Sequence, residues 1–245
     1  MIAATGLLAE AQIAARSASV KTVVSGGDAT QLAGLIEAAI AEGGRAILSF
    51  GIAGGLSEDT PTGTCLIGSE VVHAGSLYRA DAAWTARLAQ GLTIARLEQS
   101  RHRHQRSGSN AQPSGGLRPT VGRLAGNGRV LSIACEKRAL GAATGAAAVD
   151  MESHIVADLA SRHGLPFAVL RVIADPVSRA IPRAALLALR PDGSTNVMAC
   201  LRSLVRDPGQ APALVRLAVD TSRAMLQLRR CVRSLGPGLG FFERG

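Results

Sequence analysis

The sequence contains few aromatic residues and almost no lysine. Aromatic side chains make up 2% of the 245 residues, so the core is expected to be aliphatic. Of the 27 basic residues only Lys21 and Lys137 are lysine, and the net charge is +9. A nucleic-acid-binding module would place aromatic side chains beside its basic residues, so we expect no nucleic-acid partner. Attraction to an anionic membrane surface is the second interpretation of this charge.

The sequence also lacks long apolar runs and clustered cysteines. No stretch of about 18 uncharged apolar residues occurs, so no membrane-spanning helix is expected. The apolar N-terminal stretch has no basic segment and includes Glu10, which argues against a signal peptide. The four cysteines are widely spaced, which predicts small buried thiols and no metal site. We therefore expect a cytoplasmic protein, with peripheral contact to the inner membrane as a further interpretation.

A strand, a helix and a second strand are predicted within residues 146–175. The apolar runs 146–149 and 167–174 are typical of buried strands, and 151–163 has helical periodicity. Such a unit predicts two parallel strands. Asp150 and Glu152 then follow the first strand and Asp175 ends the second, at the sheet edge where open α/β sheets bind ligands.

The other expected elements complete a single α/β domain over residues 1–233. Strands are expected at 1–5, 20–24, 45–50 and 64–73, a strand or hairpin at 121–131, and helices at 7–16, 28–42, 82–90, 132–144, 184–189, 195–206 and 211–230. Residues 99–120 combine an Arg/His run with small polar residues and are expected to be a flexible loop. Paired histidines there allow a metal interpretation, but a solvated loop is favoured. Residues 234–245 are expected to be a disordered tail, for which Phe241 and Phe242 leave lipid contact open.

Two glycine-containing turns follow predicted strands, and one glutamate lies near the same edge. Residues 51–56 and 25–27 could cradle a ribose or an oxyanion with backbone N–H groups. The first turn matches neither a Walker A loop nor a complete dinucleotide fingerprint. Glu10 lies in the first turns of the first predicted helix, and the local pattern alone favours a solvated side chain there.

Three acids at one sheet edge suit bond cleavage through an oxocarbenium-like transition state. One acid protonates the leaving group, another holds the sugar, and a third activates water. Adenine departs best from an N-glycoside when a ring nitrogen is protonated. An aspartic acid whose pKa is raised by burial could donate that proton near neutral pH.

Three motifs carry a resemblance to a known family. Residues 149–152 (Val-Asp-Met-Glu) and 166–175 (Pro-Phe-Ala-Val-Leu-Arg-Val-Ile-Ala-Asp) resemble the signature of the nucleoside phosphorylase superfamily. They are similar in particular to methylthioadenosine/S-adenosylhomocysteine nucleosidases, as is the glycine turn at 49–56. The resemblance covers most of the chain except residues 99–120 and the tail. Within the superfamily, residues 149–154, 174–176 and 207–217 most resemble hopanoid-associated phosphorylases.

The resemblance implies a three-layer α/β/α sandwich with a mixed, partly barrel-like central sheet, and a homodimer. It implies an enzyme that releases adenine from adenosylhopane in hopanoid biosynthesis, without a cofactor. Glu152 would bind the ribose hydroxyls, Asp175 would protonate adenine, and Glu10 would activate water. The residues expected to line the substrate are Ser25, Gly26, Gly51, Ile52, Ala53, Gly54, Asp150, Met151 and Arg171.

The nucleophile is the main choice that the resemblance leaves open. Glu10 lies four residues after Gly6, where the nucleosidases place a glutamate and hexameric phosphorylases a phosphate-binding arginine. The hexameric phosphorylases have a second phosphate-binding arginine, and this sequence has Ser49 at the corresponding position. A carboxylate facing the nucleophile repels phosphate, so water is favoured. Arg79 or Arg123 could still bind phosphate as a co-substrate.

The substrate also remains open, since two residues depart from the nucleosidase pattern. Ala174 replaces the serine that orients the catalytic aspartate, and Ile52 replaces a polar residue near the ribose. An isoleucine adds apolar surface of the kind a triterpenoid substituent would contact. A soluble methylthioadenosine/S-adenosylhomocysteine nucleosidase or a purine nucleoside phosphorylase of salvage is the alternative enzyme. A basic binding module without catalytic activity is the alternative of another class.

Overall fold

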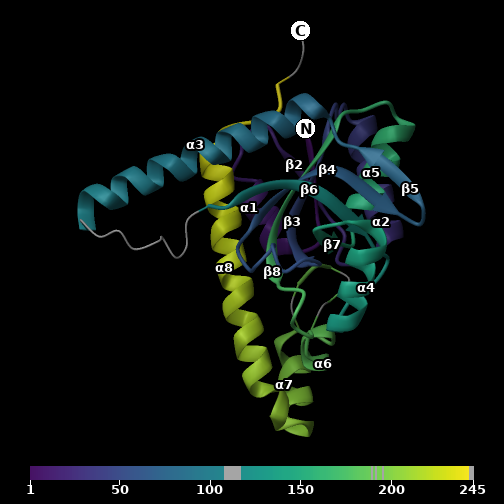
Figure 1. The fold of residues 1–245 in the computed structure, drawn as a ribbon. Coiled ribbons are helices and arrows are strands. Elements are labelled where there is room, and N and C mark those ends of the chain that lie inside the picture. The colour runs from purple at the N-terminus through teal and green to yellow at the C-terminus, as the bar shows by residue number, and fades with distance from the viewer. Residues whose placement is uncertain (108–116, 189, 191, 195, 243–245) are drawn as a thin grey trace.

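The computed structural model describes residues 1–107, 117–188, 190, 192–194 and 196–242, and its centre is one mixed sheet (Figure 1). The strands are β1 (Ile2–Thr5), β2 (Lys21–Val24), β3 (Ile47–Gly55), β4 (Cys65–His73), β5 (Ser76–Arg79), β6 (Pro119–Gly126), β7 (Ala148–Asp150) and β8 (Phe167–Asp175). Their order is β2-β1-β3-β7-β6-β4-β5, and β8 pairs with both β3 and β4. The strands β3, β7, β6, β4 and β8 therefore close a ring, which confirms the partly barrel-like sheet.

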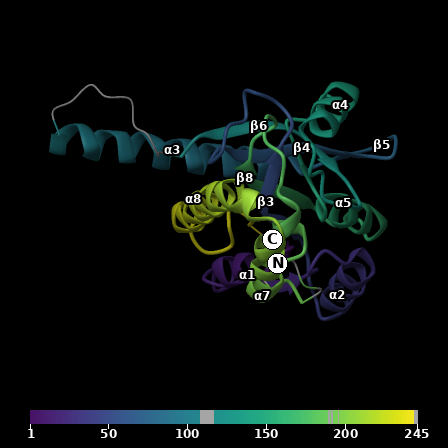
Figure 2. The same cartoon turned by 90° about the horizontal axis from the view of Figure 1, so that it is seen from below.

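Helices cover both faces of this sheet, so the expected three layers are confirmed. The helices are α1 (Leu8–Ala14), α2 (Ala29–Ala41), α3 (Ala82–Ser107), α4 (Ala134–Thr144), α5 (Ser153–Arg162), α6 (Arg183–Leu186), α7 (Val197–Arg206) and α8 (Ala211–Leu235), with a 3-10 turn η1 (Pro208–Gln210). Figure 2 shows α1, α3 and α8 on one side of β3 and β8, with α2 and α5 on the other.

The strand β8 has an almost uninterrupted apolar sequence because it is buried on both faces. Its residues Leu170 and Val172 pack into the core beneath α1, α3 and α8. Val169 and Ile173, which point the opposite way, pack into the core beneath α2 and α5.

The predicted parallel pairing of the strands on either side of α5 is wrong. β7 pairs in parallel with β6 and antiparallel with β3, whereas β8 pairs in parallel with β3 and antiparallel with β4. The cause is β3, whose register with β8 shifts between Ala53 and Gly54. Past this irregularity the end of β3 pairs with β7, which closes the barrel. The end of β7 still reaches the same cavity as the end of β8.

The expected loop at 99–120 is corrected at both of its ends. α3 continues to Ser107, and β6 begins at Pro119. Residues 92–107 contain no proline or glycine, so their composition does not break the helix. The rest of the expected loop, residues 108–116, lies outside the described residues, as do the side chains of the Arg/His run.

The expected disordered tail is corrected for residues 234–242. After α8 ends at Leu235 the chain folds back, and the side chain of Leu239 is fully buried. Trp84 Nε1 donates a hydrogen bond of 2.9 Å to Leu239 O, and the ring of Phe241 lies 5.0 Å from that of Trp84. The apolar residues between the glycines thus pack the tail against the core, although the glycine-rich composition predicts disorder. Residues 243–245 lie outside the described part.

The remaining expectations concern thiols and membrane helices. Cys65 and Cys231 are buried as expected, but Cys135 is exposed on α4, so the expectation of uniformly buried thiols is wrong. None of the helices in the described part of the chain has the length and apolar character that crossing a bilayer requires.

Candidate active site

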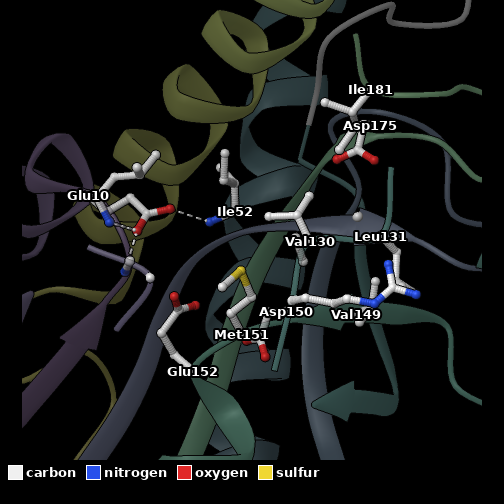
Figure 3. Close-up of a pocket in the computed structure, with 16 residues that line it drawn as sticks. Glu10, Ile52, Val130, Leu131, Val149, Asp150, Met151, Glu152, Asp175 and Ile181 are labelled. Atoms are coloured by element: carbon white, nitrogen blue, oxygen red, sulfur yellow. Dashed lines mark hydrogen bonds between the residues drawn. The ribbon is translucent and has the colours of Figure 1, made fainter. Parts of the chain in front are cut away.

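A cavity of about 200 Å³ opens where β1, β3, β7 and β8 end (Figure 3). Eight of the twelve predicted site residues line it: Glu10, Ile52, Ala53, Gly54, Asp150, Met151, Glu152 and Asp175. The other four, Ser25, Gly26, Gly51 and Arg171, do not line it but lie directly behind residues that do. Figure 3 shows Glu10 and Asp175 on opposite sides, with Met151 and Glu152 between them.

Glu10 is buried at the start of α1, so the prediction of a solvated side chain there is wrong. Its carboxylate accepts hydrogen bonds from the backbone N–H groups of Gly6 (2.9 Å), Leu7 (2.8 Å) and Ile52 (2.8 Å). Burial raises the pKa of Glu10, while nearby Arg171 and these N–H donors oppose the rise. The carboxylate is thus held at one wall, with a raised affinity for a proton.

The glycine at position 51 is required by the close approach of Glu10 and Arg171. A Cβ at Gly51 would lie 2.5 Å from Glu10 Oε1 and 2.7 Å from Arg171 Nη1. Its φ of 153° also disfavours other residues. The glycine turn therefore serves to pack charged side chains around β3, in addition to any contact with a ligand.

Arg171 is fully buried on β8 and acts as the counter-ion of the acids rather than as a cavity-lining residue. Its Nε lies 2.6 Å from Asp150 Oδ2, and its Nη2 lies 3.1 Å from Glu152 Oε2. Nη2 also donates to Ser49 Oγ at 2.7 Å. The expected substrate contact of Arg171 is corrected accordingly: it does not line the cavity, and its guanidinium is paired with Asp150 and Glu152, since an unpaired buried guanidinium would be strongly destabilising.

Glu152 lies between Glu10 and Asp175 in the cavity, and its pKa is strongly raised. Burial raises its pKa to about 7, the neighbouring carboxylates of Asp150 and Glu10 add to the rise, and Arg171 opposes it. Ser25 Oγ donates to Glu152 Oε1 at 3.1 Å, which explains the position of the predicted serine behind the floor. One guanidinium faces three carboxyl groups here, so the cluster holds a proton readily near neutral pH.

Asp175, at the end of β8, is paired with a residue that sequence reasoning missed. The Nζ of Lys137, fully buried on α4, donates to Asp175 Oδ2, to Pro176 O (3.2 Å) and to Arg179 O (2.9 Å). Burial raises the pKa of Asp175, and the Lys137 ammonium opposes the rise. Lys137 thus holds the Asp175 carboxyl group in one orientation. Lysine is rare in this arginine-rich chain, and that rarity is the one feature of the sequence that singles out Lys137.

A family profile described as the phosphorylase superfamily matches residues 17–206. The chain belongs to the phosphorylase superfamily. A search of curated proteins found no match.

Solved structures with similar folds cover nearly the whole chain. Futalosine hydrolase of Helicobacter pylori aligns with a TM-score of 0.60 at 14% identity, over 96% of each chain. The 5'-methylthioadenosine/S-adenosylhomocysteine nucleosidase of the same organism has a TM-score of 0.56 at 14% identity, over 95% of this chain and 97% of that one. The S-adenosylhomocysteine nucleosidase of Streptococcus pyogenes has a TM-score of 0.58 at 15% identity, over 94% of each chain. At such identities the likeness establishes the fold alone.

Much of the lining of the cavity is apolar. Besides Ile52 and Met151, its apolar lining comprises Leu7, Val130, Leu131, Val149 and Ile181. Sequence reasoning missed most of these residues because they come from separate loops, and residues 129–131 follow β6 rather than forming a hairpin.

Cationic groups that could bind phosphate are scarce in the cavity. Arg129 is the one cation among the described residues that line it, and its guanidinium lies 3.1 Å from Glu136. Arg123 donates to Glu70 and to Thr144 O, and Arg79 lies 3.9 Å from the same glutamate. Neither Arg79 nor Arg123 lines the cavity. The two arginines considered for phosphate thus lie beside Glu70, away from the cavity.

Proposed function

We propose that the chain cleaves the N-glycosidic bond of an adenine nucleoside, with water as the nucleophile. The observation that carries this proposal is the placement of Glu10 and Asp175 on opposite walls, with Glu152 between them. A ribose above Glu152 and Met151 would have one acid on the side of the attacking water and another on the side of the leaving base. Membership of the phosphorylase superfamily supports the same type of reaction.

Each acid then has a defined part in a balanced reaction. Water attacks C1' of the ribose, its proton passes to Glu10, and the C1'–N bond breaks with its electron pair on adenine. Asp175 delivers a proton to a ring nitrogen of adenine, while Glu152 accepts hydrogen bonds from the ribose hydroxyls. The raised pKa of Glu10 suits it to accept a proton, and the raised pKa of Asp175 favours the protonated form that can donate one to adenine.

We further propose that the substrate is adenosylhopane. Support comes from the resemblance in residues 149–154 and 207–217 and from the apolar lining, which suits a nucleoside with an apolar substituent. The similar solved structures include nucleosidases for methylthioadenosine or S-adenosylhomocysteine, so a soluble salvage substrate is the second candidate.

Incubation of the purified protein with adenosylhopane, with and without phosphate, tests both parts of the proposal. We expect free adenine without phosphate, and incorporation of ¹⁸O from labelled water into the ribosyl product. Product formed only with phosphate would overturn the choice of water. Faster cleavage of methylthioadenosine than of adenosylhopane would favour the salvage substrate.

Conservative variants test the assigned roles. Asp175→Asn should lower turnover by about 10²- to 10⁴-fold, the usual range for acid–base groups. Glu152→Gln should also lower turnover by orders of magnitude, because it weakens the hydrogen bonds to the ribose hydroxyls. Glu58→Gln is the matched control, since the side chain of Glu58 is 72% exposed. Turnover near that of the parent in either site variant, with the circular dichroism spectrum unchanged, would refute the roles.

A further inference from the structure

A lobe formed by α6, α7 and the start of α8 projects below the sheet (Figure 1). We call the described residues of 183–219 the amphipathic lobe. Its surface carries large apolar side chains that the protein leaves in contact with solvent: Leu187, Met198, Leu201, Val205, Val215 and Val219. Val205 is 82% exposed. Such a concentration is typical of a surface that binds a partner.

The exposed charges of the amphipathic lobe are mostly of one sign. Its exposed arginines are Arg183, Arg190, Arg202, Arg206 and Arg216, against the exposed acids Asp192 and Asp207. On α7, Met198, Leu201 and Val205 recur at helical spacing, with Arg202 and Arg206 beside them. Among the described residues, neither Arg202 nor Arg206 has a carboxylate within ion-pair distance. A helix of this kind lies in a membrane interface, with its apolar side in the lipid and arginines at anionic headgroups.

The amphipathic lobe adjoins the entrance of the cavity. Ile181, two residues before the lobe, lines the cavity. Gly193 O accepts a hydrogen bond of 3.1 Å from Leu8 N, next to the cavity-lining Leu7. The Arg179–Asp220 ion pair joins the segment before α6 to α8. These contacts connect the amphipathic lobe to residues at the rim of the cavity.

We propose that the amphipathic lobe docks on an anionic lipid bilayer and presents the cavity to it. The inference extends the proposed function, because a nucleoside with a lipid substituent must leave a bilayer to reach the acids. An anionic surface matches the excess of arginine, and its acyl region matches the exposed Leu, Met and Val side chains. The tail is a poorer candidate than the sequence suggests, because Leu239 and Phe241 pack against the core and Phe242 is the one large apolar side chain exposed in its described part.

Co-sedimentation with vesicles, without any nucleoside, tests the proposal independently of turnover. The full chain should bind vesicles of phosphatidylcholine and phosphatidylglycerol at low salt, and bind less to phosphatidylcholine alone or at high salt. Arg202→Gln/Arg206→Gln should weaken binding by about 30-fold, given the usual contribution of an arginine near an anionic surface. Leu201→Gln/Val205→Gln should weaken it by about tenfold or more through loss of apolar contact.

A matched double variant, Arg45→Gln/Leu77→Gln, changes the same residue types away from the lobe, where both positions are also exposed. It should bind vesicles as the parent does. Absence of binding to anionic vesicles, or equal loss in the matched variant, would overturn the proposal. A change from a larger to a smaller oligomer in the lobe variants, measured by analytical ultracentrifugation, would instead identify this face as an interface between copies and also overturn it. Vesicle binding without nucleoside cleavage would leave the docking surface standing and refute the proposed function.

Discussion

Replacing Glu152 by glutamine should lower turnover and yet stabilise the protein at alkaline pH. The pKa of Glu152 rises from 4.5 to about 7 because the carboxyl is buried beside Asp150 and Glu10. The folded protein therefore retains a proton at pH values where the unfolded chain has lost it, so Glu152 makes the protein less stable as pH rises from about 4.5 to about 7. The difference corresponds to about 3 kcal/mol. Only 8% of the side chain is exposed, so solvent screening reduces this value little.

Urea unfolding of the parent and of Glu152→Gln between pH 5 and pH 8 measures this effect. Trp84, the one tryptophan, is fully buried and reports unfolding through its fluorescence. The glutamine does not titrate, so the variant should gain up to about 3 kcal/mol over the parent between these pH values. The Glu58→Gln control should follow the parent at every pH. Parallel stability curves for the parent and Glu152→Gln would refute the assignment of a raised pKa to Glu152.

Three further predictions concern other parts of the structure. Lys137→Met should lower turnover by at least about tenfold, because Asp175 loses the group that orients it. Since the ammonium lowers the pKa of Asp175, its removal should also move the alkaline limb of the pH–kcat profile to higher pH. An unmoved limb would count against the ion pair. Gly51→Ala should destabilise the protein by about 1–3 kcal/mol through backbone strain and crowding of the acids, and an unchanged urea midpoint would contradict this. Truncation after Leu235 should destabilise the protein by about 2 kcal/mol or more and shift the emission of Trp84 to the red, whereas an unchanged spectrum would show that the returning tail contributes no packing.

The parts of the fold that the sequence predicts well are those whose pattern is local. The helix α5 follows from an apolar stripe, and β8 follows from a buried run after Gly164 and Pro166. The relative direction of β7 and β8 depends instead on where β3 changes its register, and no local pattern records that. The helical start of residues 99–120 contradicts the expected loop, because polar composition alone does not distinguish a loop from a helix.

The candidate site is predictable in its residue types but not in its electrostatics. Spacing and motif place Glu152 and Asp175 in one cavity, as the structure has them. The burial of Glu10 depends in part on one backbone N–H group of β3, that of Ile52, 42 residues away. The partner of Asp175 comes from α4, and the guanidinium of Arg171 turns to the acids behind the cavity. These long-range contacts set the proton affinities, which a single sequence does not encode in any short pattern.

The scarcity of lysine has a practical consequence for experiments on this chain. Lys137 is sealed beneath the cavity, so of the two lysines only Lys21, whose side chain is 48% exposed, is reachable by amine-reactive reagents. Lys21 starts β2, beside Ile2 at the beginning of β1, whereas the cavity lies beyond the other end of that strand. A surface or fluorophore coupled through Lys21 would therefore hold the molecules in a common orientation, with the mouth of the cavity turned toward the solution.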